Sequence, residues 1–280
     1  VLRQYYPQPW LRTSCDIDIL IHKNDLETAK EYLVNTCGYT CGTQSAHDVS
    51  FFSEDHTHIE LHYDLIEYGR ANAASGVLNT VWDACTVADG KSYQHLMSDE
   101  MFYFYHVAHM AKHLEEGGCG IRPFIDLWIL DNIEEIDKDK RTALLEQGNL
   151  LKFAETARAL SKVWIDNAAH TETTEQLENY ILSGGVYGSS ENRITVQQQK
   201  KVGRFRYALS KIFLPYEVIK FHYPILEKHK WLTPFMEVRR WFKLIFCGHA
   251  KRSLNELKCN NSVSSDTAES VKRFMENIGL

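Results

Sequence analysis

Two aspartates separated by one residue, Asp16 and Asp18, are the residues whose types and spacing most directly indicate chemistry. They alternate with Ile17, Ile19 and Ile21, which is the two-residue period of a β-strand with one apolar face. Both carboxylates then lie on the opposite face, about 6–7 Å apart, where they repel each other unless a cation or a donor lies between them. This arrangement suits a divalent metal, although a solvent-exposed edge strand that carries acids explains the pattern equally well.

A second strand pattern adds a third carboxylate. Within residues 57–65 apolar and polar side chains alternate, and Glu60 lies on the polar face with His58 and His62. If this strand is adjacent to the first, three carboxylates come together. Three carboxylates that hold Mg²⁺ or Mn²⁺ can bind a nucleoside triphosphate, activate an attacking hydroxyl and stabilise the leaving pyrophosphate.

A group of basic and polar residues further along the chain forms a second constellation. Its members are His106, His109, Lys112, His113, Arg122 and Asp126. On a helix the three histidines lie within about 60° of one face. They could bind zinc, donate hydrogen bonds to phosphates when protonated, or form a partly buried polar seam between helices. We favour contact with substrate phosphates, because the carboxylates already supply a metal site.

Several motifs follow one another along most of the chain. They are Arg-x-x-x-Asp-Ile-Asp-Ile-Leu-Ile at 12–21, a helix and a Gly-Tyr turn, Ile-Glu-Leu-His at 59–62, and the histidine, Gly-Gly-x-Gly-Ile-Arg and Asp-Leu-Trp motifs between 106 and 128. This order resembles the polymerase-beta-type nucleotidyltransferase superfamily, and more closely its bacterial group of uncharacterised nucleotidyltransferases. The resemblance implies an α+β fold in which a small mixed β-sheet domain packs on a larger α-helical domain. It also implies that Asp16 and Asp18 are the paired metal-binding acids and that Glu60 is the third.

The resemblance implies an activity as well. The protein would transfer a nucleotidyl group, with Mg²⁺, from a nucleoside triphosphate to an acceptor that could be a small molecule, a protein or RNA. Two alternatives stay open: a catalytically silent nucleotide-binding or protein-interaction module, and a metal-dependent phosphohydrolase centred on the histidines.

The superfamily places a Gly-Ser or Gly-Gly turn before the paired acids to grip the triphosphate, and residues 1–15 contain no glycine. The turn is either absent or lies before the given sequence, and both alternatives stay open. Within this sequence Arg3, Arg12 and Ser14 are the nearest upstream groups that could contact the triphosphate, and His62 is also expected to contact the substrate. We expect these 280 residues to bind the triphosphate weakly, and a longer chain that restores the turn to bind it more tightly.

The elements that position these groups divide into an expected domain at 1–92 and a helical domain at 93–280. After the strand of Asp16 and Asp18, a helix is expected from Asn24, with Glu27 completing a capping box, up to Gly38. Further strands are predicted at 39–44, 48–53 and 57–65, and none after 72. Residues 1–11 are expected to form a loop, because their prolines rule out a helix. Helices are predicted at 98–115, 123–133, 138–147, 150–167, 173–182, 195–213, 234–247 and 265–277. Ser98 is expected to cap the first of these helices and Pro123 to begin the second. The aromatic residues 102–105 are expected in the core, and 184–190 is expected to be a Gly-rich loop.

The composition indicates an ordinary soluble protein. The 280 residues are 44% hydrophobic and 24% charged, with a formal net charge of −6. No apolar run reaches membrane-spanning length and no signal peptide is visible. Seven cysteines without a regular framework indicate reduced thiols in a cytoplasmic protein. The basic segments 199–211 and 238–252 could grip RNA, but we favour solvated helix faces.

Overall fold

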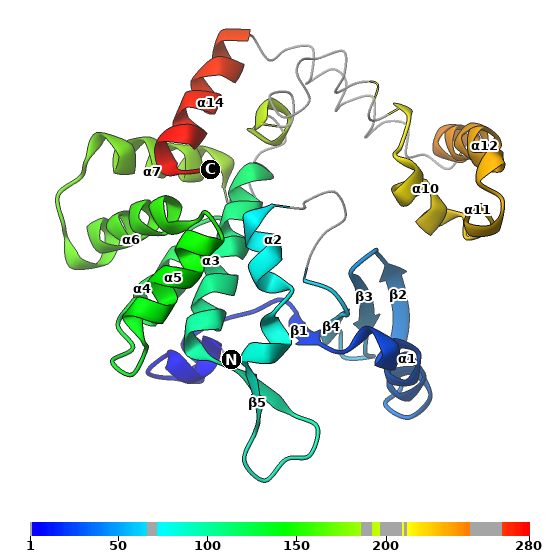
Figure 1. The fold of residues 1–280 in the computed structure, drawn as a ribbon, viewed down its shortest axis with the longest axis horizontal. Coiled ribbons are helices and arrows are strands. Elements are labelled where there is room, and N and C mark those ends of the chain that lie inside the picture. The colour runs from blue at the N-terminus through cyan, green and yellow to red at the C-terminus, as the bar shows by residue number, and fades with distance from the viewer. Residues whose placement is uncertain (1, 66–71, 186–191, 197–208, 210–211, 247–264) are drawn as a thin grey trace.

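The fold consists of a small mixed β-sheet beside a larger helical body. The computed structural model describes residues 2–65, 72–185, 192–196, 209, 212–246 and 265–280. Figure 1 shows β1 and β4 on the side of the sheet nearest to the central helices, and β3 and β2 further from them. The predicted α+β class and the predicted packing of a small sheet on helices are therefore confirmed.

The sheet has four strands in the order β1-β4-β3-β2. Their bounds are Ile17–Leu20 for β1, Thr40–Gln44 for β2, Asp48–Phe52 for β3 and His58–His62 for β4. Strands β2, β3 and β4 form antiparallel pairs, whereas β1 and β4 are parallel. Helix α1 (Leu26–Asn35) follows β1 in the chain. The expected adjacency of the strand of Asp18 and the strand of Glu60 is thus confirmed.

One face of the sheet is apolar and packs on α1. Val49, Phe51, Ile59 and Leu61 form a small core with Leu26 of this helix. Ile17 and Ile19, predicted to be buried on the same face, are 49% and 39% exposed. The physical reason is that β1 is an edge strand, whereas Leu26 of α1 packs with residues of β3 and β4.

The segments around β1 differ in detail from the prediction. Residues 2–11, expected to be a loop, contain two 3-10 turns, η1 (Leu2–Tyr5) and η2 (Pro9–Leu11). The Asn24 capping box is wrong. A 3-10 turn, η3 (Lys23–Asp25), leads directly into α1, and the N-cap residue Asp25 makes no side-chain cap. Backbone bonds of the 3-10 type satisfy the first N–H groups instead, as they commonly do at helix ends.

The helical body begins with α2 and a short hairpin. Helix α2 (Ala73–Leu78) is followed by the turn η4 (Val81–Ala84) and by strands β5 (Cys85–Val87) and β6 (His95–Met97). These two strands pair antiparallel, so the prediction that no strand follows residue 72 is wrong. Strands of three residues are shorter than the window in which alternation can be recognised.

Of the remaining helices that the structure describes, seven match the predicted ones closely, whereas two, at Tyr216–His222 and Ile225–Lys228, were not predicted. Their bounds are Asp99–Glu115 (α3), Arg122–Asp131 (α4), Lys138–Gln147 (α5), Leu151–Asp166 (α6), Glu172–Gly184 (α7), Tyr216–His222 (α10), Ile225–Lys228 (α11), Thr233–Phe246 (α12) and Ser265–Ile278 (α14), with the turn η5 at Lys230–Leu232. Ser98 caps α3 as predicted, and Pro123 lies in the first turn of α4. The expected helix at 195–213 and the Gly-rich loop at 184–190 lie largely outside the described residues.

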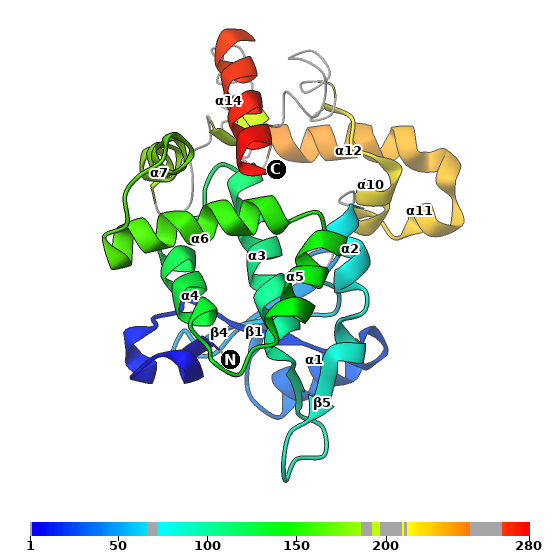
Figure 2. The same cartoon turned by 60° about the vertical axis from the view of Figure 1, so that its left-hand side comes forward.

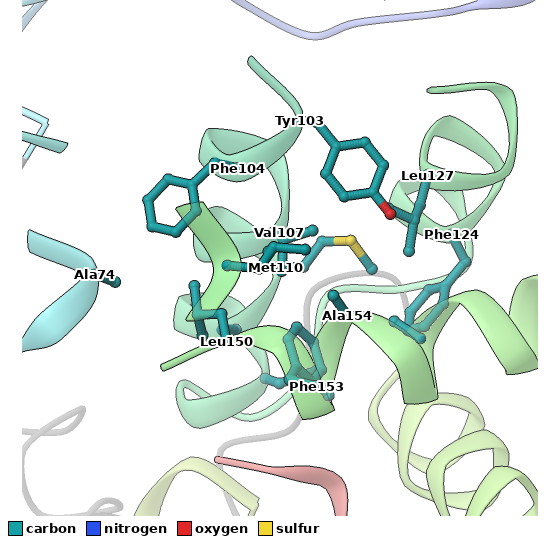
Figure 3. Packing of buried hydrophobic residues seen from close by; sticks show 14 of the residues in the cluster. Ala74, Tyr103, Phe104, Val107, Met110, Phe124, Leu127, Leu150, Phe153 and Ala154 are labelled. Atoms are coloured by element: carbon teal, nitrogen blue, oxygen red, sulfur yellow. The ribbon is translucent and has the colours of Figure 1, made fainter. Parts of the chain in front are cut away.

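The main core lies among α3, α4 and α6. Figure 3 shows Tyr103, Phe104 and Met110 of α3 packed with Phe124 of α4 and Phe153 of α6. The C-terminal helix α14 also contributes side chains to this core, and Figure 2 shows it at the end of the body near α7.

The core residues bear on the division of the chain. Ala74, Val77 and Val81 belong to the helical core, and residue 92 lies between the paired strands β5 and β6. The boundary at 92 remains a prediction, because hydrophobic packing already joins residues before it to the helical body.

The polar face of the sheet is turned toward α3. Leu20, which shares this face of β1 with Asp18, packs against the helical core, and so does Tyr105 of α3. The sheet therefore contacts the helical body through the face that carries the carboxylates, while α1 covers the opposite face.

Two glycines test how tightly the helical core is packed. An added Cβ at Gly148 would lie 2.5 Å from Cζ of the buried Phe104 ring, whereas at Gly76 it would meet nothing within 4 Å. We expect Gly148→Ala to lower the free energy of unfolding by about 1–3 kcal/mol through overpacking, and Gly76→Ala to raise it by about 0.5–1 kcal/mol. Urea denaturation measures both; a neutral Gly148→Ala would contradict the packing described.

Candidate functional site

The site is built on the polar faces of β1 and β4. Asp18 lies directly opposite Glu60 in the parallel register, and Asp16 precedes β1 by one residue on the same face. Asp16 and Glu60 form a group with His58 whose ligand atoms lie within 4.8 Å of one another, and Asp18 and Glu60 form a similar group with His62. The alternation of side chains along two adjacent strands thus brings the three carboxylates to one place. We call this set, Asp16, Asp18 and Glu60, the acidic site.

The electrostatics of the acidic site are asymmetric. A hydrogen bond from Nε2 of His62 to Oδ1 of Asp18, 3.0 Å long, lowers the pKa of Asp18 and outweighs the effect of burial. Burial, together with the negative charges of Asp18 and Asp16, raises the pKa of Glu60. Glu60 is thus the carboxylate that gains most from a cation, because a positive charge would offset both causes of its shift.

His58 provides an independent indication of a metal. Its Nε2 atom is buried without a hydrogen-bond partner and lies 3.7 Å from Oε1 of Glu60. The ring stacks on Phe52 with centroids 4.5 Å apart, which limits its orientation. A buried ring nitrogen without a partner costs about 1–3 kcal/mol, and a cation shared with Glu60 and Asp16 would remove that cost. The residues present therefore fit a divalent metal.

Tyr105 and His109 of α3 lie across from the acids. The two rings stack with centroids 5.7 Å apart. Burial and then the charges of Asp18 and Glu60 raise the pKa of Tyr105, and His109 and Asp18 each influence the other's pKa. Such mutual effects require proximity, so this face of α3 borders the acidic site.

The three histidines of α3 do not act as one face. His106 is buried and its Nε2 lies 2.8 Å from the carbonyl oxygen of Pro123. His109 and His113 instead contact each other through their Nε2 atoms at 3.1 Å. Of the metal-binding groups found among the described residues, none contains these three histidines. A zinc site or a phosphohydrolase centre on this helix is therefore without geometric support.

His109 differs from the protonated donor expected from the sequence. His109 is exposed to solvent, and its ring stacks on Tyr105 and lies edge-on to His113. Burial, followed by the positive charges of His113 and Lys112, lowers the pKa of His109 to about 3. The ring is neutral at physiological pH, where it can donate or accept one hydrogen bond. Lys112 lies close enough to add positive charge beside it.

Arg12 and Asp126 bind each other rather than facing the acids. Arg12 donates from Nε and Nη2 to the two carboxylate oxygens of Asp126, at 2.7 and 2.9 Å. Tyr6 donates to the same carboxylate at 2.5 Å, and Asp126 is completely buried. This network fixes the segment before β1 on helix α4. We infer that both residues position Asp16 instead of contacting phosphates.

The other predicted contacts lie around the same segment. Arg122, at the start of α4, donates from Nη1 to the carbonyl oxygen of Thr13 at 3.2 Å, and Arg12 donates to that oxygen as well. Ser14 is exposed and lies two residues before Asp16. Two arginines thus hold the backbone that leads into the acidic site.

Sequence reasoning missed three residues that the structure brings close to the acids. His47 and Asp48, at the start of β3, form a third potential metal-binding group with His62. Tyr105 was assigned to the core, where it packs only in part. His47 and Asp48 could have been identified only from the pairing of β3 with β4, which alternation along a single strand does not reveal. His58 was recognised on the polar face but not as a ligand.

The sequence profile of one protein family matches the chain over residues 1–166, from the N-terminal segment to the last residue of α6. The family is described as uncharacterised nucleotidyltransferase. The chain belongs to this family. The matched region contains the whole four-stranded sheet, the hairpin and helices α1 to α6, and so it includes every residue of the acidic site. No curated protein and no solved structure matches this nucleotidyltransferase family member significantly.

None of the described helices combines the length and the apolar composition of a membrane span.

The Arg12–Asp126 pair gives a stability prediction. Removing the guanidinium leaves a buried, uncompensated carboxylate, so Arg12→Ala should lower the free energy of unfolding by about 3–5 kcal/mol. Lys272→Ala, which breaks an exposed pair with Glu276, should cost about 0–1 kcal/mol. Both are measured by urea denaturation. Equal small effects of the two changes would show that Arg12 does not fix the segment.

His106 gives a prediction of pH dependence. Burial lowers the pKa of His106 despite its bond to Pro123, so below about pH 6.5 the unfolded chain binds more protons than the folded chain. The free energy of unfolding should therefore fall as the pH drops below about 6.5. His106→Gln, which keeps an N–H donor, should make this dependence shallower. Denaturation curves at several pH values from 7.5 to 5 test the expectation, and identical slopes would contradict it.

Proposed function

We propose that the protein is a metal-dependent nucleotidyltransferase that moves a nucleotidyl group from a nucleoside triphosphate to an acceptor. The observation that carries the proposal is the placement of Asp18 directly opposite Glu60, with Asp16 and the buried Nε2 of His58 beside them. Membership of a nucleotidyltransferase family supports the reaction type. The identity of the nucleotide and of the acceptor, and a cytoplasmic location, remain predictions.

The acidic site would hold the metal. Asp16, Asp18 and Glu60 offer hard oxygen ligands of the kind that Mg²⁺ and Mn²⁺ prefer, and His58 offers one nitrogen. A bound divalent ion supplies neutralisation of phosphate charge and activation of the attacking hydroxyl. Nitrogen ligands suit Mn²⁺ better than Mg²⁺. Because of His58, we expect the site to bind Mn²⁺ more tightly than Mg²⁺.

The residues of α3 would meet the substrate from the opposite side. Neutral His109 can donate one hydrogen bond to an oxygen of the nucleotide or the acceptor. Lys112 and His113 lie on the same helix, and the charge of Lys112 acts on His109. A phosphate group between α3 and the acids would be attracted by the ammonium of Lys112, while the acids hold the metal. His62 keeps Asp18 ionised and oriented through its hydrogen bond.

We assign the phosphate contacts that were expected of Arg12 to residues of helix α3 instead. The guanidinium of Arg12 already uses Nε and Nη2 on Asp126. Breaking those bonds would expose a buried charge, which is costly. Lys112, whose charge acts on His109, is therefore a better candidate than Arg12 for binding the triphosphate.

Asp18→Asn tests the proposed function. Losing a metal-binding charge that contributes several kcal/mol to the transition state should lower turnover on the order of 10³-fold or more. The fold should remain, because the Asp18 side chain is 55% exposed. Transfer of label from the four α-labelled triphosphates, in Mg²⁺ and in Mn²⁺, gives the activity, and Mn²⁺ electron paramagnetic resonance gives metal binding.

Asp89→Asn is the matched control, since Asp89 is exposed in the turn between β5 and β6. This variant should retain full activity and full metal binding. Nucleotide binding without transfer in the unchanged protein would favour the catalytically silent module. Turnover by Asp18→Asn equal to that of the control would refute the role given to the acidic site.

A further inference from the structure

A second cluster of metal-ligating side chains lies next to the acidic site. His47 and Asp48 begin β3, and His62 ends β4 directly opposite Asp48 in the antiparallel register. The ligand atoms of these three residues lie within 4.8 Å of one another, and all three side chains are partly buried. Two imidazoles and one carboxylate are the ligand set of many three-residue zinc centres.

Ser45 orients two of the three side chains. Its hydroxyl donates to Oδ1 of Asp48, and its Oγ lies 3.1 Å from Nδ1 of His47. The same oxygen accepts from the backbone N–H groups of His47 and Asp48, at 3.2 Å each. These bonds connect both residues to one serine, so the two side chains are held close together.

The ring of His47 and the carboxylate of Asp48 lie close together. Nε2 of His47 lies 3.7 Å from Oδ2 of Asp48, the oxygen that does not accept from Ser45. Two ligands bound tetrahedrally to zinc at about 2.1 Å lie about 3.4 Å apart, so a shift of a few tenths of an ångström would place one ion between these atoms. Imidazole nitrogen and carboxylate oxygen are both ligands that zinc binds.

The third residue has the hydrogen bond that metal-binding histidines usually make. Nε2 of His62 lies 3.0 Å from Oδ1 of Asp18. A ring N–H that donates to a carboxylate fixes the orientation of the imidazole, which is the usual arrangement of metal-binding histidines. In the same way, Ser45 holds His47. Each imidazole of the cluster thus has an orienting partner.

We propose that His47, Asp48 and His62 form a zinc site that adjoins the acidic site and is separate from it. This zinc site is an addition to the transfer reaction proposed above, which uses the acidic site. Imidazole-rich sites select Zn²⁺, whereas the acidic site is dominated by the oxygen ligands that Mg²⁺ and Mn²⁺ prefer. His62 connects the two sites, because its ring would bind zinc with one nitrogen and hold Asp18 with the other.

Zinc binding itself provides the test. The full chain is dialysed against Zn²⁺ in a buffer that contains millimolar Mg²⁺, and bound zinc is counted by mass spectrometry. We expect one zinc per chain. His47→Asn should lose it, Ser45→Ala should weaken it by about 10- to 100-fold, and His56→Asn, in the exposed turn between β3 and β4, should retain it. Circular dichroism verifies that each variant is folded.

Two further measurements separate this site from the alternatives. Asp16→Asn, which removes a ligand of the acidic site only, should retain zinc even if transfer activity is lost or was never present. Co²⁺ in place of zinc should give the visible spectrum of a nitrogen and oxygen site without a thiolate charge-transfer band. Zinc lost in Asp16→Asn but kept in His47→Asn, a thiolate band, or no zinc bound at all would overturn the proposal.

Discussion

The buried contact between Arg12 and Asp126 is the interaction on which the arrangement of the site depends. It joins a segment that precedes β1 to a helix more than a hundred residues later in the chain. Tyr5 adds a second attachment through Asp99 at the start of α3, and burial together with that bond raises the pKa of Tyr5 to about 12. Asp16 follows this segment directly. Without these attachments, the first carboxylate of the site would have no fixed position relative to α3, because β1 is an edge strand held on one side only.

The second constraint is the repulsion among the carboxylates. The parallel register of β1 and β4 places Asp18 and Glu60 side by side on one face of the sheet. The protein stabilises the charge of Asp18 with His62, yet burial and the neighbouring charges still raise the pKa of Glu60. This imbalance, with the buried Nε2 of His58 beside it, explains why the site suits a cation. Strand β3, on the other side of β4, brings Asp48 opposite His62, with His47 directly before it. One polar sheet face could therefore serve two ions.

How far the sequence predicts the structure depends on the range of the interactions involved. Alternation along single strands was enough to place each carboxylate on the polar face of its strand, whereas the adjacency of the two strands was expected from the family resemblance and is seen in the structure. The capping serine of α3 and the proline of α4 were correctly recognised. The roles of Arg12 and Asp126 could not be foreseen, because either side chain alone looks like a surface charge and only the tertiary contact buries them. The exposure of Ile17 follows from strand order, which periodicity does not specify. Helical spacing grouped His106 with His109, whereas packing against α4 decided which ring is buried.

The central claim is that the polar face of β1 and β4 binds a divalent cation together with a nucleoside triphosphate. The most direct measurement is anomalous diffraction from crystals of the full chain grown with Mn²⁺ and a non-hydrolysable triphosphate. The account predicts a manganese peak bounded by Asp16, Asp18 and Glu60, with the triphosphate between that ion and helix α3. A peak elsewhere on the molecule, with the three carboxylates bound only to protein groups, would contradict it.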